Sequence, residues 1–89
     1  MKFALNVCTA TKGKITDVYP MTYFPTLKEG KKKIFSEDFI YSIKRSMAIN
    51  LKTQYYDADF EVTKREDLNT LTIVWKNEYK VCFTIVPIE

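Results

Sequence analysis

Hydrophobic and polar residues alternate in the first part of the chain. Over residues 2–8 every second side chain is apolar, from Phe3 to Val7, and the side chains between them point the other way. A period of two is typical of a half-buried strand, so we expect a strand here. Residues 15–24 are rich in β-branched and aromatic side chains, but Pro20 lacks the N–H that a sheet ladder needs. This segment therefore predicts an edge strand, or a strand broken at the proline.

The pattern changes to that of a helix over residues 35–54. Ser36 is a favourable N-cap, because its hydroxyl can accept a hydrogen bond from a free N–H group of the first turn. The carboxylates of Glu37 and Asp38 follow it and favour the positive end of the helix dipole. The apolar stripe that predicts the core-facing side consists of Phe39, Ile40, Ile43, Met47 and Leu51. We expect the preceding residues, 25–33, to form a loop.

Two further strands are predicted on either side of Lys76–Glu78. A slip of one residue in a hairpin turns every side chain of a strand to the other face. The length of the loop can therefore be predicted from which register puts the apolar side chains on one face. A three-residue loop puts all the apolar side chains of the two strands on one face. The register that results pairs Trp75 with Tyr79, Ile73 with Val81, and Leu71 with Phe83. In this register Cys82 points away from the core, as Cys8 does.

These elements follow the order β-β-α-β-β-β in a single α+β domain over residues 1–89. We expect a small antiparallel sheet of four to five strands with one helix packed on one face. The second face is then either solvated or bound by a partner. Residues 55–64 also alternate and predict a strand, with Asp57, Asp59 and Glu61 in one row. Such a row could hold a metal, but the side chains would lie about 7 Å apart, which favours a solvated face.

The composition argues against most catalytic chemistry. The chain has no histidine, which removes the commonest general base and the commonest metal ligand. Two cysteines, Cys8 and Cys82, are too few for a disulfide framework or a zinc site. They could pair with each other if their strands adjoin, or be redox-active, but inert thiols are the favoured interpretation. With only Gly13 and Gly30, no glycine-rich phosphate loop can form. The sequence therefore predicts a protein that is not an enzyme and that binds no metal and no cofactor.

The sequence also favours a cytoplasmic location. No segment approaches the roughly 18 apolar residues that span a bilayer, and the first apolar run is shorter than the core of a secretory signal. Lys, Ile, Asn, Tyr and Phe total 36 residues, whereas Gly, Ala, Arg and Pro total 11. The first group has AT-rich codons, so this bias suggests a low-GC bacterium or one of its phages.

Positive charge is concentrated in the first part of the chain. Residues 1–52 carry ten Lys and Arg against four Asp and Glu, and residues 53–89 carry four against seven. This asymmetry predicts one basic and one acidic surface. Lysines 28 and 31–33 could neutralise phosphates of a nucleic acid. Glu37 and Asp38 would repel a phosphate, however, and lysine is common in solvated loops, so an acidic protein surface is the favoured partner.

Residues 19–25, YPMTYFP, are the most suggestive for binding. Tyrosine and methionine are enriched in interface cores, and edge strands are ready docking sites. The alternative is that these rings only close one end of a small core. The candidate partner-binding residues, taken with the basic ones, are Tyr19, Met21, Tyr23, Phe24, Lys31, Lys32, Lys33, Tyr41, Lys44 and Arg45.

The sequence thus leads to three functional hypotheses. The first is a small non-enzymatic interaction module, of the kind that phages use to bind and sterically block a host enzyme or defence complex. The second is a nucleic-acid-binding accessory protein that uses the basic loop and the outer face of the helix. The third, which no motif supports, is a histidine-free nuclease or toxin. A homodimer through an edge strand or the open sheet face is a further expectation.

Overall fold

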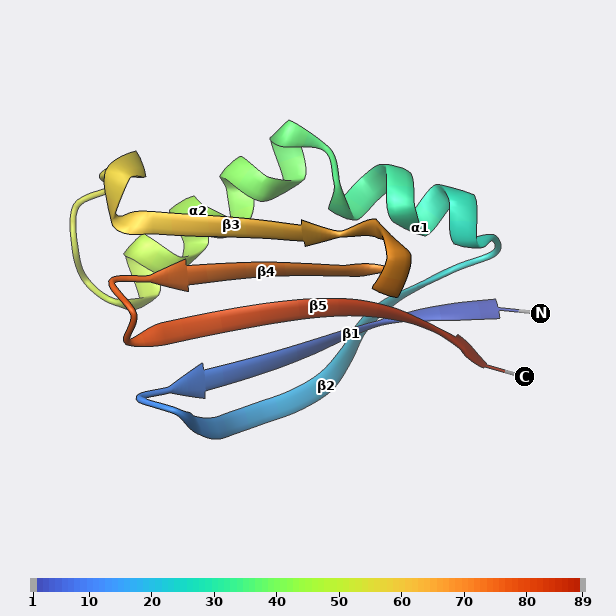
Figure 1. Ribbon diagram of the computed structural model, residues 1–89, viewed down its shortest axis with the longest axis horizontal. Coiled ribbons are helices and arrows are strands. Elements are labelled where there is room, and N and C mark those ends of the chain that lie inside the picture. Colours follow the sequence, from blue (N-terminus) through green and yellow to red (C-terminus); the bar gives the residue numbers. More distant parts are fainter. Residues whose placement is uncertain (1, 89) are drawn as a thin grey trace.

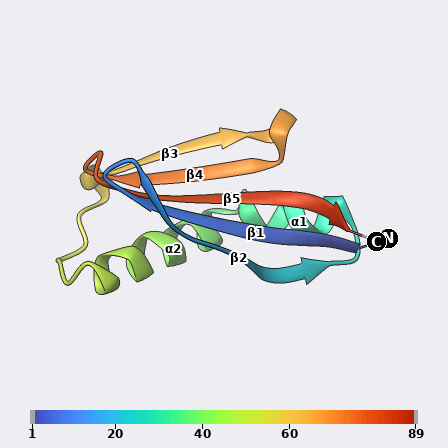
Figure 2. The ribbon, with the colours of Figure 1, turned by 90° about the horizontal axis from the view of Figure 1, so that it is seen from below.

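The computed structural model describes residues 2–88 and shows an antiparallel five-stranded sheet with two helices on one face (Figures 1 and 2). The predicted α+β class is confirmed. The strands are β1 (Lys2–Thr11), β2 (Lys14–Phe24), β3 (Phe60–Arg65), β4 (Thr70–Trp75) and β5 (Tyr79–Ile88). The helices are α1 (Leu27–Ile34) and α2 (Glu37–Asn50), and short 3-10 turns occur at Asp57–Asp59 (η1) and Glu66–Leu68 (η2).

The order of strands in the sheet is β2-β1-β5-β4-β3. The first and last strands of the chain are therefore neighbours, and they pair along their whole length from Lys2 opposite Ile88 to Thr11 opposite Tyr79. The two edges of the sheet are β2 and β3. The prediction that residues 15–24 form an edge strand is confirmed, and β2 runs through Pro20 without a break.

The core lies between the sheet and the two helices. Its fully buried side chains come from both layers, with Leu5, Leu71, Ile73 and Phe83 from the sheet and Ile34 from α1. Burying each of these side chains stabilises the fold by about 1.5–3 kcal/mol. Most of the stripe predicted for α2 is buried with them: Phe39, Ile40 and Met47 are buried, and Ile43 packs against the cluster.

The register predicted for the C-terminal hairpin is confirmed. Trp75 lies opposite Tyr79, Ile73 opposite Val81, and Leu71 opposite Phe83. The connecting loop has the predicted three residues, and Lys76 and Asn77 adopt positive φ angles of 48° and 57°. The apolar pairs all face the helices, so this hairpin supplies the centre of the core.

The prediction of a loop over residues 25–33 was wrong, because this segment forms α1. Thr26 caps it, since its hydroxyl oxygen accepts a hydrogen bond from the N–H of Glu29 at 3.2 Å. Gly30 is buried, and a Cβ atom there would lie 2.9 Å from Cδ1 of Ile85. The absence of a side chain lets α1 lie close on the sheet, and this contact anchors a helix that the lysines would otherwise leave in solvent.

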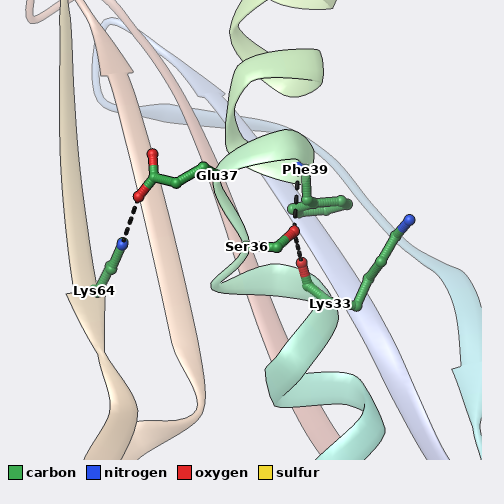
Figure 3. Close-up of polar contacts among 5 residues, drawn as sticks. All are labelled: Lys33, Ser36, Glu37, Phe39 and Lys64. Carbon is green, nitrogen blue, oxygen red and sulfur yellow. Dashed lines mark hydrogen bonds and ion pairs between the residues drawn. The ribbon is translucent and has the colours of Figure 1, made fainter.

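Ser36 joins the two helices (Figure 3). Its hydroxyl oxygen accepts a hydrogen bond from the N–H of Phe39 at 3.2 Å, which confirms the predicted N-cap of α2. The same hydroxyl donates to the carbonyl oxygen of Lys33 in the last turn of α1 at 2.8 Å. One side chain therefore satisfies a free group at each of two helix ends. Beside this junction, Lys64 of β3 forms an ion pair with Glu37 at 3.4 Å.

The strand predicted over residues 55–64 is shorter than expected. Residues 57–59 form η1, and β3 begins only at Phe60. The predicted row of Asp57, Asp59 and Glu61 on one strand face is therefore wrong. Asp57 instead pairs with Lys44 at 2.8 Å, and the carboxylate of Asp59 lies 3.9 Å from the ammonium of Lys76. A 3-10 turn rather than an extended strand brings these carboxylates to lysines of neighbouring elements.

The sheet face opposite the helices is the outer face, and no described element covers it. Its central side chains include Asn6, Cys8, Cys82 and Thr84, all of them half-buried. Ala4 lies on the same face but is buried, since its small side chain sits between its cross-strand neighbours Tyr23 and Val86. The outer face is thus mixed in polarity in its centre.

Candidate functional site

The edge strand β2 is the most exposed strand of the sheet. All of its residues from Lys14 to Tyr23 are exposed, and only Phe24 is half-buried. Five of the nine exposed large hydrophobic side chains of the described chain belong to this strand: Ile15, Val18, Tyr19, Met21 and Tyr23. Exposed apolar residues are ordinary when scattered singly, whereas a contiguous group indicates a binding surface. We call these five side chains the β2 surface.

Two irregularities interrupt the pairing of β2 with β1. Leu5 pairs with Thr22 and Asn6 with Pro20, so Met21 is an extra residue on β2. Thr9 pairs with Asp17 and Ala10 with Ile15, so Thr16 is a second one. Such bulges twist an edge strand and re-aim its side chains, and with Pro20 they reduce indiscriminate pairing of an exposed edge. The bulges and Pro20 hinder pairing along the edge but leave its apolar side chains exposed.

The β2 surface extends over both sides of the sheet. On the helix side, Tyr19 and Met21 line a groove of about 220 Å³ whose opposite wall is formed by Ile43 and Met47 of α2. On the outer face, Ile15 lies beside its β1 neighbour Ala10, Val18 beside Cys8, and Tyr23 beside Ala4. The strand therefore presents apolar side chains in both directions, with an exposed main chain between them.

Lysines lie at both ends of β2. Lys12 and Lys14 flank the turn at its start. At its end, Phe24 shares a shallow concavity with Glu29, Lys32 and Lys33 of α1. The residues up to the end of α1, numbered 1–34, include seven lysines against two carboxylates, a balance of +5. The surface around β2 is thus apolar along the strand and basic at its ends.

The ion pairs of the described chain all lie away from β2. They join Lys44 to Asp57, Lys64 to Glu37, Arg65 to Asp67, and Lys76 to Asp59. Within residues 2–88, no carboxylate lies within ion-pair distance of Lys12, Lys14, Lys32 or Lys33. Two of these ion pairs, Lys44–Asp57 and Lys64–Glu37, join the basic first part of the chain to the acidic second part. The lysines at the ends of β2 take part in none of them.

Three of the residues predicted for binding form a separate cluster on the other side of α2. The guanidinium of Arg45 lies 5.8 Å from the ring centroids of both Tyr41 and Tyr55. Lys44 is bound to Asp57, and its side chain is only 14% exposed. This cluster fastens residues 55–57 to α2. Lys44 is therefore occupied within the chain rather than presented to a partner.

Two ionisable groups of this cluster, the Tyr55 phenol and the Asp57 carboxyl, have shifted pKa values. Burial and then a hydrogen bond to Asp57 raise the pKa of the Tyr55 phenol to about 12. The pKa of Asp57 is lowered, first by the hydrogen bond from Lys44 and then by that from Tyr55. Both shifts follow from contacts that hold the loop before β3 in place. Their cause is structural, and neither group lies near β2.

The structure thus divides the residues predicted for binding. It brings Tyr19, Met21, Tyr23 and Phe24 together on β2 and sets Lys32 and Lys33 beside the end of that strand, with Lys31 half-buried on the same helix. It places Tyr41, Lys44 and Arg45 on the opposite side of α2 from the groove. Ile15 and Val18 were not predicted, because the bulge at Thr16 is what places both side chains on the outer face.

Comparisons with protein-family models, with curated proteins and with solved structures find no match for this chain. Neither α1 nor α2 has the length and apolar run that a membrane-spanning helix requires. Within residues 2–88, no three His, Cys, Asp or Glu side chains gather in a way that could hold a metal ion. The candidate site therefore rests on the geometry of β2 and its surroundings.

Proposed function

We propose that this protein is a non-enzymatic interaction module that binds a larger protein through β2 and sterically blocks part of its surface. The observation that supports this function best is the exposed edge strand with five large apolar side chains. Natural proteins usually cover or charge an edge of this kind, because it promotes association. Because the largest group of exposed apolar side chains lies on this open edge, the edge is the surface best suited to bind a partner.

The more specific form of this proposal is an inhibitor encoded by a phage of a low-GC host, acting in the cytoplasm on a host enzyme or defence complex. Its supports are the bias toward AT-rich codons, the length of 89 residues and the absence of histidine from the sequence. Steric blocking requires only a surface, so a domain with a small core and no catalytic set is sufficient for it.

Site-specific photocrosslinking tests this proposal. A photoreactive amino acid replaces Ile15 on β2 in one variant and Ile49 on α2 in another. Both isoleucines are 69% exposed, so the two probes have matched access to solvent. In lysate of a low-GC bacterium, we expect one discrete adduct from position 15 and none from position 49, with the partner identified by mass spectrometry. Equal labelling from the two positions, or no adduct from position 15, would reject binding through β2.

A second candidate function is binding of nucleic acid, and α1 is the observation that favours it. Because residues 27–34 are helical, Lys28, Lys31 and Lys32 have the i, i+3, i+4 spacing that places side chains on one helix face. Phosphate binding by these lysines would weaken steeply with added salt. Fluorescence anisotropy with labelled DNA and RNA over a salt series tests it, and replacing the three lysines with glutamate should abolish binding. Absent or salt-insensitive binding removes this candidate.

A further inference from the structure

The partner's contribution to the interface can be inferred from the edge strand, and this inference rests on the proposed function. We propose that β2 accepts an extended segment of the partner as an additional strand, and that this segment is apolar in its middle and acidic at its ends. Each part of this description follows from one feature of β2. These features are its main chain, its apolar side chains on the two faces of the sheet, and the lysines at its ends.

The main chain of β2 calls for an extended segment. Because β1 is the only strand of residues 2–88 that pairs with it, β2 has a row of main-chain N–H and C=O groups along its free side. Adding a strand to such an edge is a recurring way of binding peptides, in which main-chain hydrogen bonds supply affinity. The eleven residues of β2 span about 37 Å at the rise of an antiparallel strand. Pro20 removes one donor, and the bulges at Thr16 and Met21 limit which registers fit.

The two apolar rows of β2 define the middle of the segment. Successive side chains of an added strand would point alternately to the two faces of the sheet. One set would lie beside Tyr19 and Met21 and reach the groove bounded by α2. The other set would lie beside Ile15 and Val18 on the outer face. Since both sets meet apolar surface, the middle of the segment is a continuous apolar run rather than an alternating one.

The lysines define the ends of the segment. Lys12 and Lys14 stand at one end of β2, and Lys32 and Lys33 at the other, with no carboxylate of residues 2–88 paired to them. Acidic residues on both flanks of the incoming strand would meet these charges whichever way it runs. Charge complementarity of this kind selects partners and speeds association more than it adds affinity.

A second copy of this chain fits the edge less well. Two β2 strands paired antiparallel would set Lys14 of one copy beside Lys32 of the other, at both ends of the pair. The other edge strand, β3, would not relieve this repulsion, because it carries Lys64 and Arg65 against Glu61, and it has only six residues against the eleven of β2. Its outward side chains are Glu61, Thr63 and Arg65, which offer no apolar match to Ile15 and Val18. The partner strand therefore comes from a different protein.

Selection from a displayed library of random 12-residue peptides tests this proposal with the intact protein. We expect the enriched peptides to share a central apolar run flanked by Asp or Glu. A synthetic copy of one such peptide should slow hydrogen exchange at β2 amides, as new main-chain hydrogen bonds require. The same peptide with N-methyl groups on the alternate amides that face β2 should fail to bind. No enrichment, enrichment of basic or helical peptides, or unchanged exchange at β2 would overturn the proposal.

Variants separate the parts of the interaction. Lys32→Glu should weaken binding of the selected peptide about two- to fivefold, the range of an exposed charge pair. Lys52→Glu, the same charge change on an exposed lysine after α2, should leave it unchanged. Val18→Asp should abolish binding, whereas Ile49→Asp should not. Equal effects of Lys32→Glu and Lys52→Glu would contradict the proposal that the ends of the segment are acidic. Unchanged binding in Val18→Asp would contradict the proposal that its middle is apolar.

Failure of this inference is distinguishable from failure of the proposed function. If position 15 crosslinks to one partner while no acidic, extended peptide binds, the interaction module stands and strand addition falls. If the free protein forms dimers in analytical ultracentrifugation that Val18→Asp dissociates, β2 is instead a self-association edge and the inference is rejected.

Discussion

Cys8 and Cys82 lie directly opposite each other on the neighbouring antiparallel strands β1 and β5. Both thiols are free, half-buried and on the outer face of the sheet. Directly opposed residues of antiparallel strands have Cα atoms about 4.5 or 5.5 Å apart, and both spacings fall within the range of disulfides, about 4.4–6.8 Å. Residues from opposite ends of the chain therefore form a cross-strand pair of thiols.

We expect mild oxidation to join these thiols within one molecule. Diamide would remove two electrons and two protons from the pair and be reduced to its hydrazine, leaving one S–S bond. Since the bond closes a loop of most of the chain, it should raise the free energy of unfolding by up to about 4 kcal/mol. Thiol titration, mass spectrometry and urea denaturation measure these changes. Cys8→Ser is the control, and oxidation that yields only covalent dimers would contradict the pairing.

Gly30 leads to a prediction about packing. A side chain there would meet Ile85 and Phe24, 2.9 and 3.2 Å from the Cβ position. We expect Gly30→Val to lower the free energy of unfolding by about 1–3 kcal/mol through overpacking. Lys32→Val, on the exposed side of the same helix, should cost only about 0.5 kcal/mol of helix propensity. Urea denaturation measures both, and equal losses would show that α1 does not lie close on the sheet.

Most strands could be predicted because their patterns are local. The alternation of residues 2–8 and the loop-length argument at Lys76–Glu78 depend only on the period of a strand, and tertiary packing did not override them. Helix α1 was missed because four lysines in eight residues looked like a loop. A usable signal was present, since Thr26 and Glu29 have the spacing of a capping box. The packing of Gly30 that anchors the helix depends on Ile85, far along the chain.

The candidate site was predictable only in part, for a related reason. Tyrosine, methionine and proline marked β2 as a binding segment from composition alone. Ile15 and Val18 share the outer face because of the bulge at Thr16, which interrupts the alternation of the strand and has no signature in the sequence pattern. The opposition of Cys8 and Cys82 depends on the order of strands in the sheet. Local patterns do not specify which strands become neighbours.

Ser36 should be more important for stability than Thr26, although both are N-caps. Ser36→Ala removes the cap of α2 and the hydrogen bond to Lys33 of α1, and we expect it to cost about 1–2 kcal/mol. Thr26→Ala removes only the hydrogen bond from the N–H of Glu29, and about 1 kcal/mol or less is expected. Urea denaturation of the two variants gives the comparison. An equal or larger loss for Thr26→Ala would argue against a joint between the helices.

Asp57 should make the protein's stability depend on acid pH. Its folded-state pKa lies below its ordinary value of 3.8, chiefly because of the hydrogen bond from Lys44. Its contribution is therefore fully present above that value and is lost as pH falls through the folded-state pKa. We expect the Tm of the wild type to exceed that of Asp57→Asn near neutral pH, with a difference that shrinks below about pH 4. Glu61→Gln is the control, because the ion pairs of residues 2–88 do not include Glu61.

The same carboxylate should control the alkaline titration of Tyr55. Burial is the largest cause of its raised pKa of about 12, followed by the hydrogen bond that its hydroxyl donates to Asp57 at 2.7 Å. Asp57→Asn keeps a side chain of similar size but removes the negative charge that opposes ionisation of the phenol. We therefore expect the pKa of Tyr55 to fall toward 10 without reaching it, since burial remains. Ultraviolet titration follows the ionisation, and subtraction of the Tyr55→Phe curve isolates this residue among the six tyrosines. An unchanged titration in Asp57→Asn would show that the hydroxyl does not bind this carboxylate in solution.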